Sequence, residues 1–119
     1  MSLDWTDAQQ ETYDDFRDAV NMAPQELEDW LDTDASRSVG DADGGESTGH
    51  RSGRRIVEIK RKTKDELTES DLDHMQEVVG YIHRHRAQEP SGDVSETDWR
   101  YSLMNWGHDP CKDEGVDCG

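Results

Sequence analysis

The sequence predicts an all-α protein, a small single-domain bundle of four to five helices. Two observations support this. Apolar residues recur at spacings of three and four in several separate segments, and eight aromatic residues, four of them Trp, supply large side chains for a core. A chain of 119 residues has room for one modest core. We expect one helical domain over residues 1–110, with a long Gly/Ser-rich loop at 33–53 and a flexible C-terminal tail at 111–119.

The first two helices are predicted from a capping box and a proline. Thr6 followed three residues later by Gln9 is a typical helix start, and an apolar face follows it at Tyr13, Phe16 and Val20. This pattern predicts a helix over about 7–21. Pro24 suits a first helical position, where its missing N–H needs no partner, and Leu27, Trp30 and Leu31 form the next apolar face. We expect a second, short helix at about 24–32.

The middle of the chain is harder to assign. Residues 33–53 are dominated by Gly, Ser, Thr and Asp without an apolar period, and loops of this length are functional or disordered. In the following IVEI, at 56–59, apolar and polar residues alternate loosely, as they would in a strand. Ile56, Ile59 and Lys60 also suit a helix over about 53–63, which we favour.

Two further helices are predicted after this segment. Thr68 and Asp71 form a second capping box, and an apolar face over about 69–88 contains Leu72, Met75, Val79 and Ile82. Pro90 ends that helix. A last short helix from Asp98 to about Trp106 would close the core with aromatic side chains, and Gly107 would end it.

The composition is strongly acidic. Eighteen Asp and eleven Glu face nine Arg and four Lys, giving a formal charge of −16. Only seventeen residues are Leu, Ile, Val or Phe. We interpret this as the surface of a halophilic protein from a cell with molar internal salt, which screens the self-repulsion. Folding is then expected to require salt.

The cations are not spread evenly. Residues 1–50 carry fourteen acids and two Arg, whereas residues 51–88 carry nine cations and seven acids, and six of the eleven residues in RRIVEIKRKTK at 54–64 are Arg or Lys. A helix starting near Gly53 would add its positive dipole end beside STGHRSGRR. Such a group typically meets phosphates. The predicted nucleic-acid-binding residues, for DNA rather than RNA, are His50, Arg51, Ser52, Arg54, Arg55, Lys60, Arg61, Lys62 and Lys64.

Two alternatives remain open. The same cations could pair with neighbouring Asp and Glu within the fold. The protein could also be a small protein-interaction or stress-associated module, with no nucleic-acid partner, whose basic patch docks an acidic protein or pairs internally.

Other chemistry is not predicted. No activated nucleophile or G-x-S-x-G motif occurs, so we expect no enzyme, no cofactor and no small-molecule substrate. His108, Cys111 and Cys118 could supply three metal ligands, but a fourth is missing, and we favour free thiols in the tail over a metal site. Without an apolar run of 18 residues or a signal peptide, we expect a cytoplasmic protein with no membrane contact.

Three blocks carry a family resemblance: GGESTGHRSGRRIVEI, LTESDLDHMQEVVGYIHRHRAQEPSGD and WRYSLMNWGHDP. In this order and spacing they closely resemble the uncharacterised family called domain of unknown function thirty-one-forty, from about Tyr13 to Pro110. Some members carry the label "DNA-binding protein", so the resemblance implies the same kind of partner. It implies no catalytic residues, and it implies that the loop from Gly45 to Arg55 is part of the fold. This chain departs from the pattern in its acidity and in the tail CKDEGVDCG.

Overall fold

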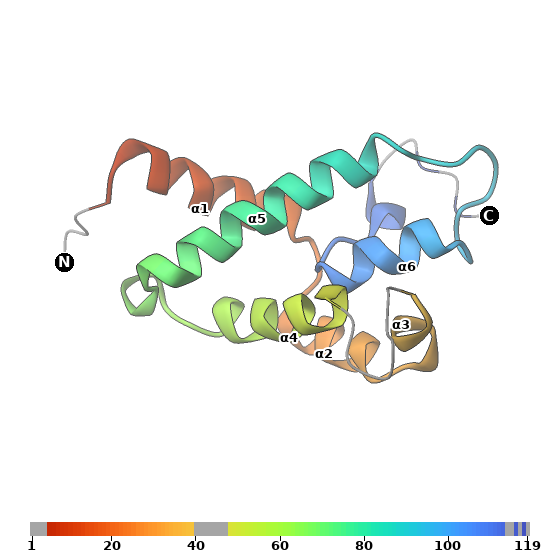
Figure 1. Cartoon of the computed structure of the whole chain (residues 1–119), viewed down its shortest axis with the longest axis horizontal. Helices are drawn as coiled ribbons and strands as arrows, with labels where there is room; N and C mark the ends of the chain where they lie inside the picture. Colours follow the sequence, from red (N-terminus) through yellow and green to blue (C-terminus); the bar gives the residue numbers. More distant parts are fainter. Residues whose placement is uncertain (1–4, 40–47, 114–115, 117, 119) are drawn as a thin grey trace.

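The computed structural model describes residues 5–39, 48–113, 116 and 118. Within these residues the chain is helical and contains no strand (Figure 1). The elements are α1 (Asp7–Ala19), α2 (Pro24–Leu31), α3 (Asp34–Ser38), α4 (Thr48–Lys60), η1 (Lys64–Glu66), α5 (Glu69–Arg86), α6 (Asp98–Asn105) and η2 (Pro110–Lys112). The prediction of a small all-α fold is confirmed, and so is the choice of helix over strand at Ile56–Ile59.

The helices pair in two layers. α1 packs along α5, and α2 packs along α4 (Figure 1). α6 joins the two pairs, since it contacts α2, α3, α4 and α5. The core between them is formed by buried residues from all of these longer helices: Phe16, Leu27, Leu31, Ile56, Ile59, Leu72, Met75, Val78, Ile82, Trp99, Leu103 and Trp106.

Helix ends follow local caps where these exist. The Thr6 hydroxyl accepts from the Gln9 N–H at the start of α1, and the Thr68 hydroxyl accepts from the Asp71 N–H at the start of α5. Both predicted capping boxes are therefore present. At the far end of α6, Gly107 adopts a φ of +82°, the left-handed conformation that ends many helices.

The predicted loop at 33–53 is wrong at both of its ends. α3 begins within it because the Thr33 hydroxyl caps a new turn by accepting from the Ser36 N–H at 3.1 Å. α4 begins at Thr48, so Gly53 lies inside the helix instead of at its start. With α3 included, the described residues form six α-helices, one more than predicted.

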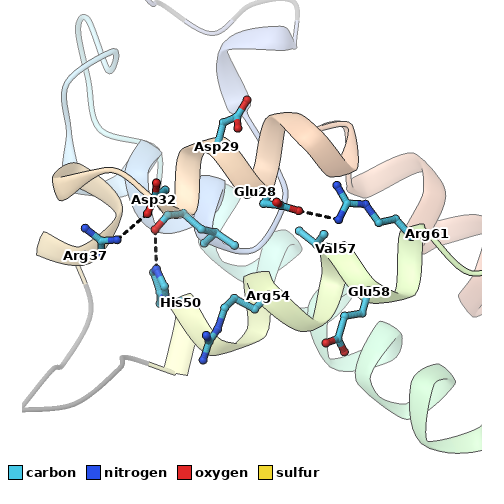
Figure 2. A pocket seen from close by; sticks show the side chains of 10 residues that line it. Glu28, Asp29, Asp32, Arg37, His50, Arg54, Val57, Glu58 and Arg61 are labelled. Atoms are coloured by element: carbon cyan, nitrogen blue, oxygen red, sulfur yellow. Dashed lines mark hydrogen bonds and ion pairs between the residues drawn. The ribbon is translucent and has the colours of Figure 1, made fainter.

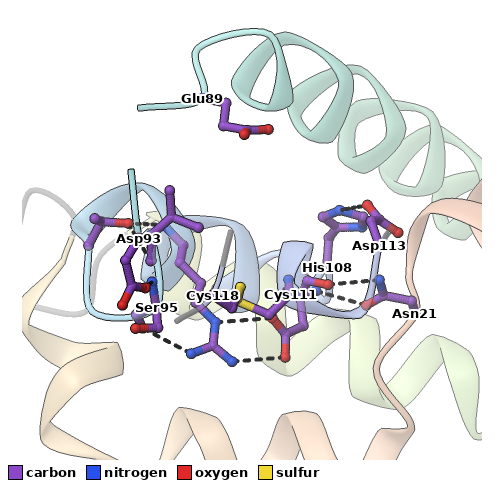
Figure 3. Close-up of a disulfide and its surroundings, with 12 residues drawn as sticks. Asn21, Glu89, Asp93, Ser95, His108, Cys111, Asp113 and Cys118 are labelled. Carbon is purple, nitrogen blue, oxygen red and sulfur yellow. Dashed lines mark hydrogen bonds and ion pairs between the residues drawn. A yellow bond between two sulfur atoms is a disulfide. The ribbon is translucent and has the colours of Figure 1, made fainter. Parts of the chain in front are cut away.

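The C-terminal segment is held to the fold by side chains. Asn21 donates to the Asp109 carbonyl at 3.0 Å and accepts from the Asp109 N–H at 2.8 Å. The buried His108 donates from Nδ1 to the Ala19 carbonyl at 2.7 Å. Cys111 and Cys118 form a disulfide next to this anchor (Figure 3), so the prediction of free thiols is wrong.

Two further structural findings limit the classes of site. Among the residues placed by the structure, no group of three or more His, Cys, Asp or Glu is arranged to hold a metal ion. No helix in the described part of the chain is both long and apolar enough to cross a bilayer.

Candidate nucleic-acid interface

One face of α4 and its extension is basic. At 100° per residue, five cations fall within an arc of roughly 120°. The N–H of Arg61 still bonds the Val57 carbonyl at 3.2 Å, so the helical path continues past Lys60. We call this surface the basic face; it consists of Arg51, Arg54, Arg55, Arg61 and Lys62.

The opposite side of α4 explains why the cations point outward. Ser52, Gly53, Ile56, Val57 and Ile59 are buried against the rest of the fold, whereas the members of the basic face are exposed or partly exposed. α4 is thus an amphipathic helix whose polar side is mostly cationic. One acid, the exposed Glu58, lies within the same arc.

Arg55, Arg61 and Lys62 each lie close to a carboxylate of the fold. Arg61 lies 2.7 Å from Glu28, and Lys62 lies 2.7 Å from Asp71. Arg55 donates to the Ser70 hydroxyl at 2.8 Å and lies 3.6 Å from Asp71. Arg61 and Glu28 are 49% and 52% exposed, and an ion pair at such a site contributes at most about 1 kcal/mol. A phosphate could therefore replace Glu28 at little cost in stability, whereas the Asp71 side chain is only 7% exposed and its cationic partners are costly to remove.

The basic face also contains Arg51 and Arg54. Arg51 is exposed, and no described carboxylate forms an ion pair with it. Arg54 lines a pocket of about 550 Å³ between α2 and α4 (Figure 2). Four carboxylates also line that pocket, those of Glu28, Asp29, Asp32 and Glu58. A polyanion is therefore better placed on the outer basic face than inside the pocket.

Asp71 connects the basic face to α5. Its side chain is only 7% exposed, and its Oδ2 accepts from Lys62 Nζ at 2.7 Å and from the Thr68 N–H at 3.1 Å. Burial by itself would raise the pKa of this carboxyl, but these hydrogen bonds and the Lys62 charge outweigh burial and hold the pKa below its usual value of 3.8. The carboxylate is thus ionised and structural.

Asp71→Asn is expected to destabilise the protein in a pH-dependent way. Because the folded state lowers the pKa of Asp71, its stabilisation is fully present above 3.8 and is lost as the pH falls through the lower folded-state pKa. At pH 7 we expect a loss of about 2 kcal/mol in unfolding free energy, measured by urea titration at fixed salt. The difference in unfolding free energy between wild type and variant should become smaller below about pH 4. Asp73→Asn is the control, since Asp73 is exposed on the same helix, and it should change the unfolding free energy little. A loss in Asp71→Asn that does not depend on pH would contradict the role of Asp71 as an ionised structural carboxylate.

Four predicted site residues lie away from the basic face. His50 Nε2 donates to the Leu31 carbonyl at 2.7 Å, and the buried Ser52 hydroxyl lies 3.0 Å from His74 Nε2. Lys60 donates to the carbonyls of Val20 and Met22, at 3.2 and 3.1 Å. These contacts hold helices together.

Lys64 is the fourth. It donates to Gln10 Oε1 at 2.8 Å and lies over the rings of Trp5 and Tyr13. The structure thus separates Lys60 and Lys64 from the arginines of α4 and turns them toward α1. Since α4 begins at Thr48, the anion site predicted at a helix start near Gly53 is also absent.

Sequence reasoning did not include Arg17 in the basic group. Arg17 lies on α1 and lines the same pocket as Lys60, Lys62 and Lys64. The sequence contains one indication of a special role for Arg17, because it is one of only two arginines among the first fifty residues.

Comparison with known proteins identifies a family. A family model described as "Protein of unknown function (DUF3140)" matches residues 15–104. No curated protein matches the chain, and no solved structure does.

Proposed function

This chain belongs to the DUF3140 family of proteins of unknown function, and we propose from its surface chemistry that it is a non-catalytic DNA-binding protein. In this proposal the basic face of α4 holds backbone phosphates. The protein acts in the cytoplasm of a cell with high internal salt, where a protein of such acid-rich composition remains folded.

The observation that carries the proposal is the outward arc of five cations on a chain of formal charge −16. From Arg51 to Lys62 the helical path rises roughly 16 Å. That length covers about five phosphate steps along one DNA strand. A single exposed helix also fits the major groove of B-form DNA, whereas A-form RNA has a deep, narrow major groove that side chains cannot read.

The intramolecular carboxylates set the strength of such binding. Glu28, Asp71 and Glu58 compete with phosphate for the same cations. Binding is then weak, dependent on several simultaneous contacts and steeply sensitive to salt. No catalytic step is involved.

A salt titration with paired variants tests this proposal. Duplex DNA binding is followed by fluorescence anisotropy over a range of KCl concentrations in which circular dichroism shows a folded protein. Wild type should give a slope of log K against log salt of about −4. In the double variant with Arg51→Gln and Arg54→Gln, the magnitude of this slope should fall by about 2. Glu58→Gln removes the acid within the arc and should tighten binding by about tenfold.

Arg37→Gln is the matched control, since Arg37 lies on α3 and pairs with Asp32 at 2.9 Å. It removes one positive charge away from the basic face and should leave the slope unchanged. Absence of binding at every salt concentration that keeps the helices folded would refute the proposal. So would equal losses in the double variant and the control.

A second candidate function has its own support. Arg55, Arg61 and Lys62 of the basic face are already paired with carboxylates. Such pairing is expected if the charges of this surface are neutralised within the fold and not by a nucleic acid. If DNA binding is absent, a small protein-interaction or stress-associated module becomes the better proposal.

A further inference from the structure

We propose that a second basic surface, a pocket between α1 and the α4–η1 connection, binds a small organic phosphate. The pocket has a volume of about 320 Å³. It is lined by the cations Arg17, Lys60, Lys62 and Lys64, by the polar Tyr13 and Thr63, and by the apolar Phe16, Ile59, Leu67 and Met75. No Asp or Glu is among these lining residues. We call it the lysine pocket.

Within the described ranges 5–39 and 48–113, three of its cations contact neutral groups. Arg17 donates to the Tyr13 hydroxyl of its own helix at 3.1 Å. Lys60 donates to two backbone carbonyls, and Lys64 to the Gln10 amide oxygen and two aromatic rings. In the part of the chain that the structure places, none of the three forms an ion pair with a carboxylate.

This arrangement is unexpected for such a composition. The chain has twenty-nine acids for thirteen Arg and Lys, so acidic partners are plentiful. Cations left beside one another without a carboxylate repel, and a ligand that brings negative charge would remove the repulsion. Lys62 is the exception, because Asp71 already neutralises it.

The state of Lys60 agrees with this picture. Burial lowers its pKa most, and the nearby positive charges of Arg17 and Lys112 lower it further, against a smaller opposite effect of Glu26. A bound anion would oppose these shifts and favour the charged ammonium.

The lysine pocket and the basic face share Lys62, which is paired with Asp71, but their other cations lie on different sides of the helix. Lys60 follows Arg51 by nine residues, which places the two side chains on opposite sides of the helix. A ligand of the lysine pocket therefore contacts α1 and the α4–η1 connection, and it need not touch Arg51 or Arg54.

The lining favours an organic phosphate. A guanidinium and two ammonium groups approaching from different elements match the several acceptor oxygens of a phosphate group. The apolar residues and the Tyr13 ring provide contact for a carbon-containing body. The volume lies at the lower end of the range for ligand pockets, which limits that body to a small size.

Titration with phenyl phosphate tests the proposal. Amide chemical shifts are followed by NMR at constant ionic strength, with inorganic phosphate and phenol as comparison probes. We expect saturable shifts around Tyr13 and Lys64, with phenyl phosphate binding about tenfold more tightly than inorganic phosphate and phenol not binding. Arg17→Gln and Lys64→Gln should each weaken phenyl phosphate binding by about tenfold.

Arg51→Gln is the matched control for charge and should leave phenyl phosphate binding unchanged. Arg17→Gln should fold normally, since within the described residues the Arg17 guanidinium contacts Tyr13 of the same helix. Absence of saturable shifts would overturn the proposal, as would an equal effect of Arg51→Gln, which would indicate diffuse charge attraction. Because Arg17→Gln should retain DNA binding, failure of this site and failure of the proposed function are distinguishable.

Discussion

Gly53→Ala is expected to lower the unfolding free energy by about 3 kcal/mol. A Cβ at this position would collide with the Asn105 carbonyl oxygen and would lie 2.7 Å from Leu31 Cδ2. Neither neighbour can move freely, since Asn105 ends α6 and Leu31 is buried at the end of α2. The added methyl group would push α4 away from both helices. Urea unfolding monitored by Trp fluorescence, at fixed salt, measures the loss.

Gly80→Ala is the matched control on α5. A Cβ at Gly80 would approach only the end of the flexible Arg84 side chain, at 3.1 Å. An alanine is intrinsically favoured over glycine in a helix interior by about 1 kcal/mol, so this variant should gain stability. The two substitutions therefore have opposite expected signs. If both stabilised the protein, the close approach of α4 to α6 and α2 would be incorrect.

The same glycine explains why the predicted start of α4 was wrong. Caps and proline placed the starts of α1, α2 and α5 correctly because these signals act within one helical turn. Gly53 disfavours a helix locally, and its use inside α4 depends on Asn105 and Leu31, which are distant in the sequence. Contacts of that range leave no local signal. The start at Thr48 therefore could not be read from residue preferences.

α3 illustrates the same limit on a smaller scale. Its five residues contain no apolar period to detect. It is held from outside, because Ser36 is fully buried, its hydroxyl donates to Asn105 Oδ1, and its carbonyl accepts from Asn105 Nδ2 at 3.1 Å. Trp30 Nε1 donates to the same Asn105 oxygen at 2.9 Å. One buried amide on α6 thus fixes two elements that the sequence shows only as a helix followed by a loop.

The candidate site was predictable in part. Helical spacing places Arg51, Arg54 and Arg55 on one face, and that arrangement requires only that the segment be helical. Which carboxylates reach this face could not be predicted, because Glu28 comes from another helix. Arg17 was missed for the same reason. Its nearness to Lys60 depends on how α1 packs, and the pattern of α1 alone does not contain that information.

The aromatic residues were expected to close the core, and their arrangement yields the second large prediction. Trp106 is 5% exposed and stacks on Tyr81 with ring centroids 4.2 Å apart and planes 14° apart. The His74 ring is also nearly parallel to that of Trp106, with centroids 6.4 Å apart, and His74 also contacts Ser52 of α4. Burial, followed by the charge of Arg55, lowers the pKa of His74, which favours its neutral form in this stack. One indole therefore joins the end of α6 to α5, and through His74 to α4.

Trp106→Ala is accordingly expected to cost about 4 kcal/mol, the range for removing a buried Trp from a packed core. Trp106→Phe should recover part of this loss, because a smaller ring still fills the space next to Tyr81. Trp5→Ala is the control: Trp5 is only partly buried, precedes α1 and contacts the Tyr13 ring at 5.3 Å, so about 1 kcal/mol is expected. Urea unfolding at fixed salt, followed by far-UV circular dichroism because a Trp is removed, measures all three. Equal losses at positions 5 and 106 would show that the ring stack does not hold the helices together.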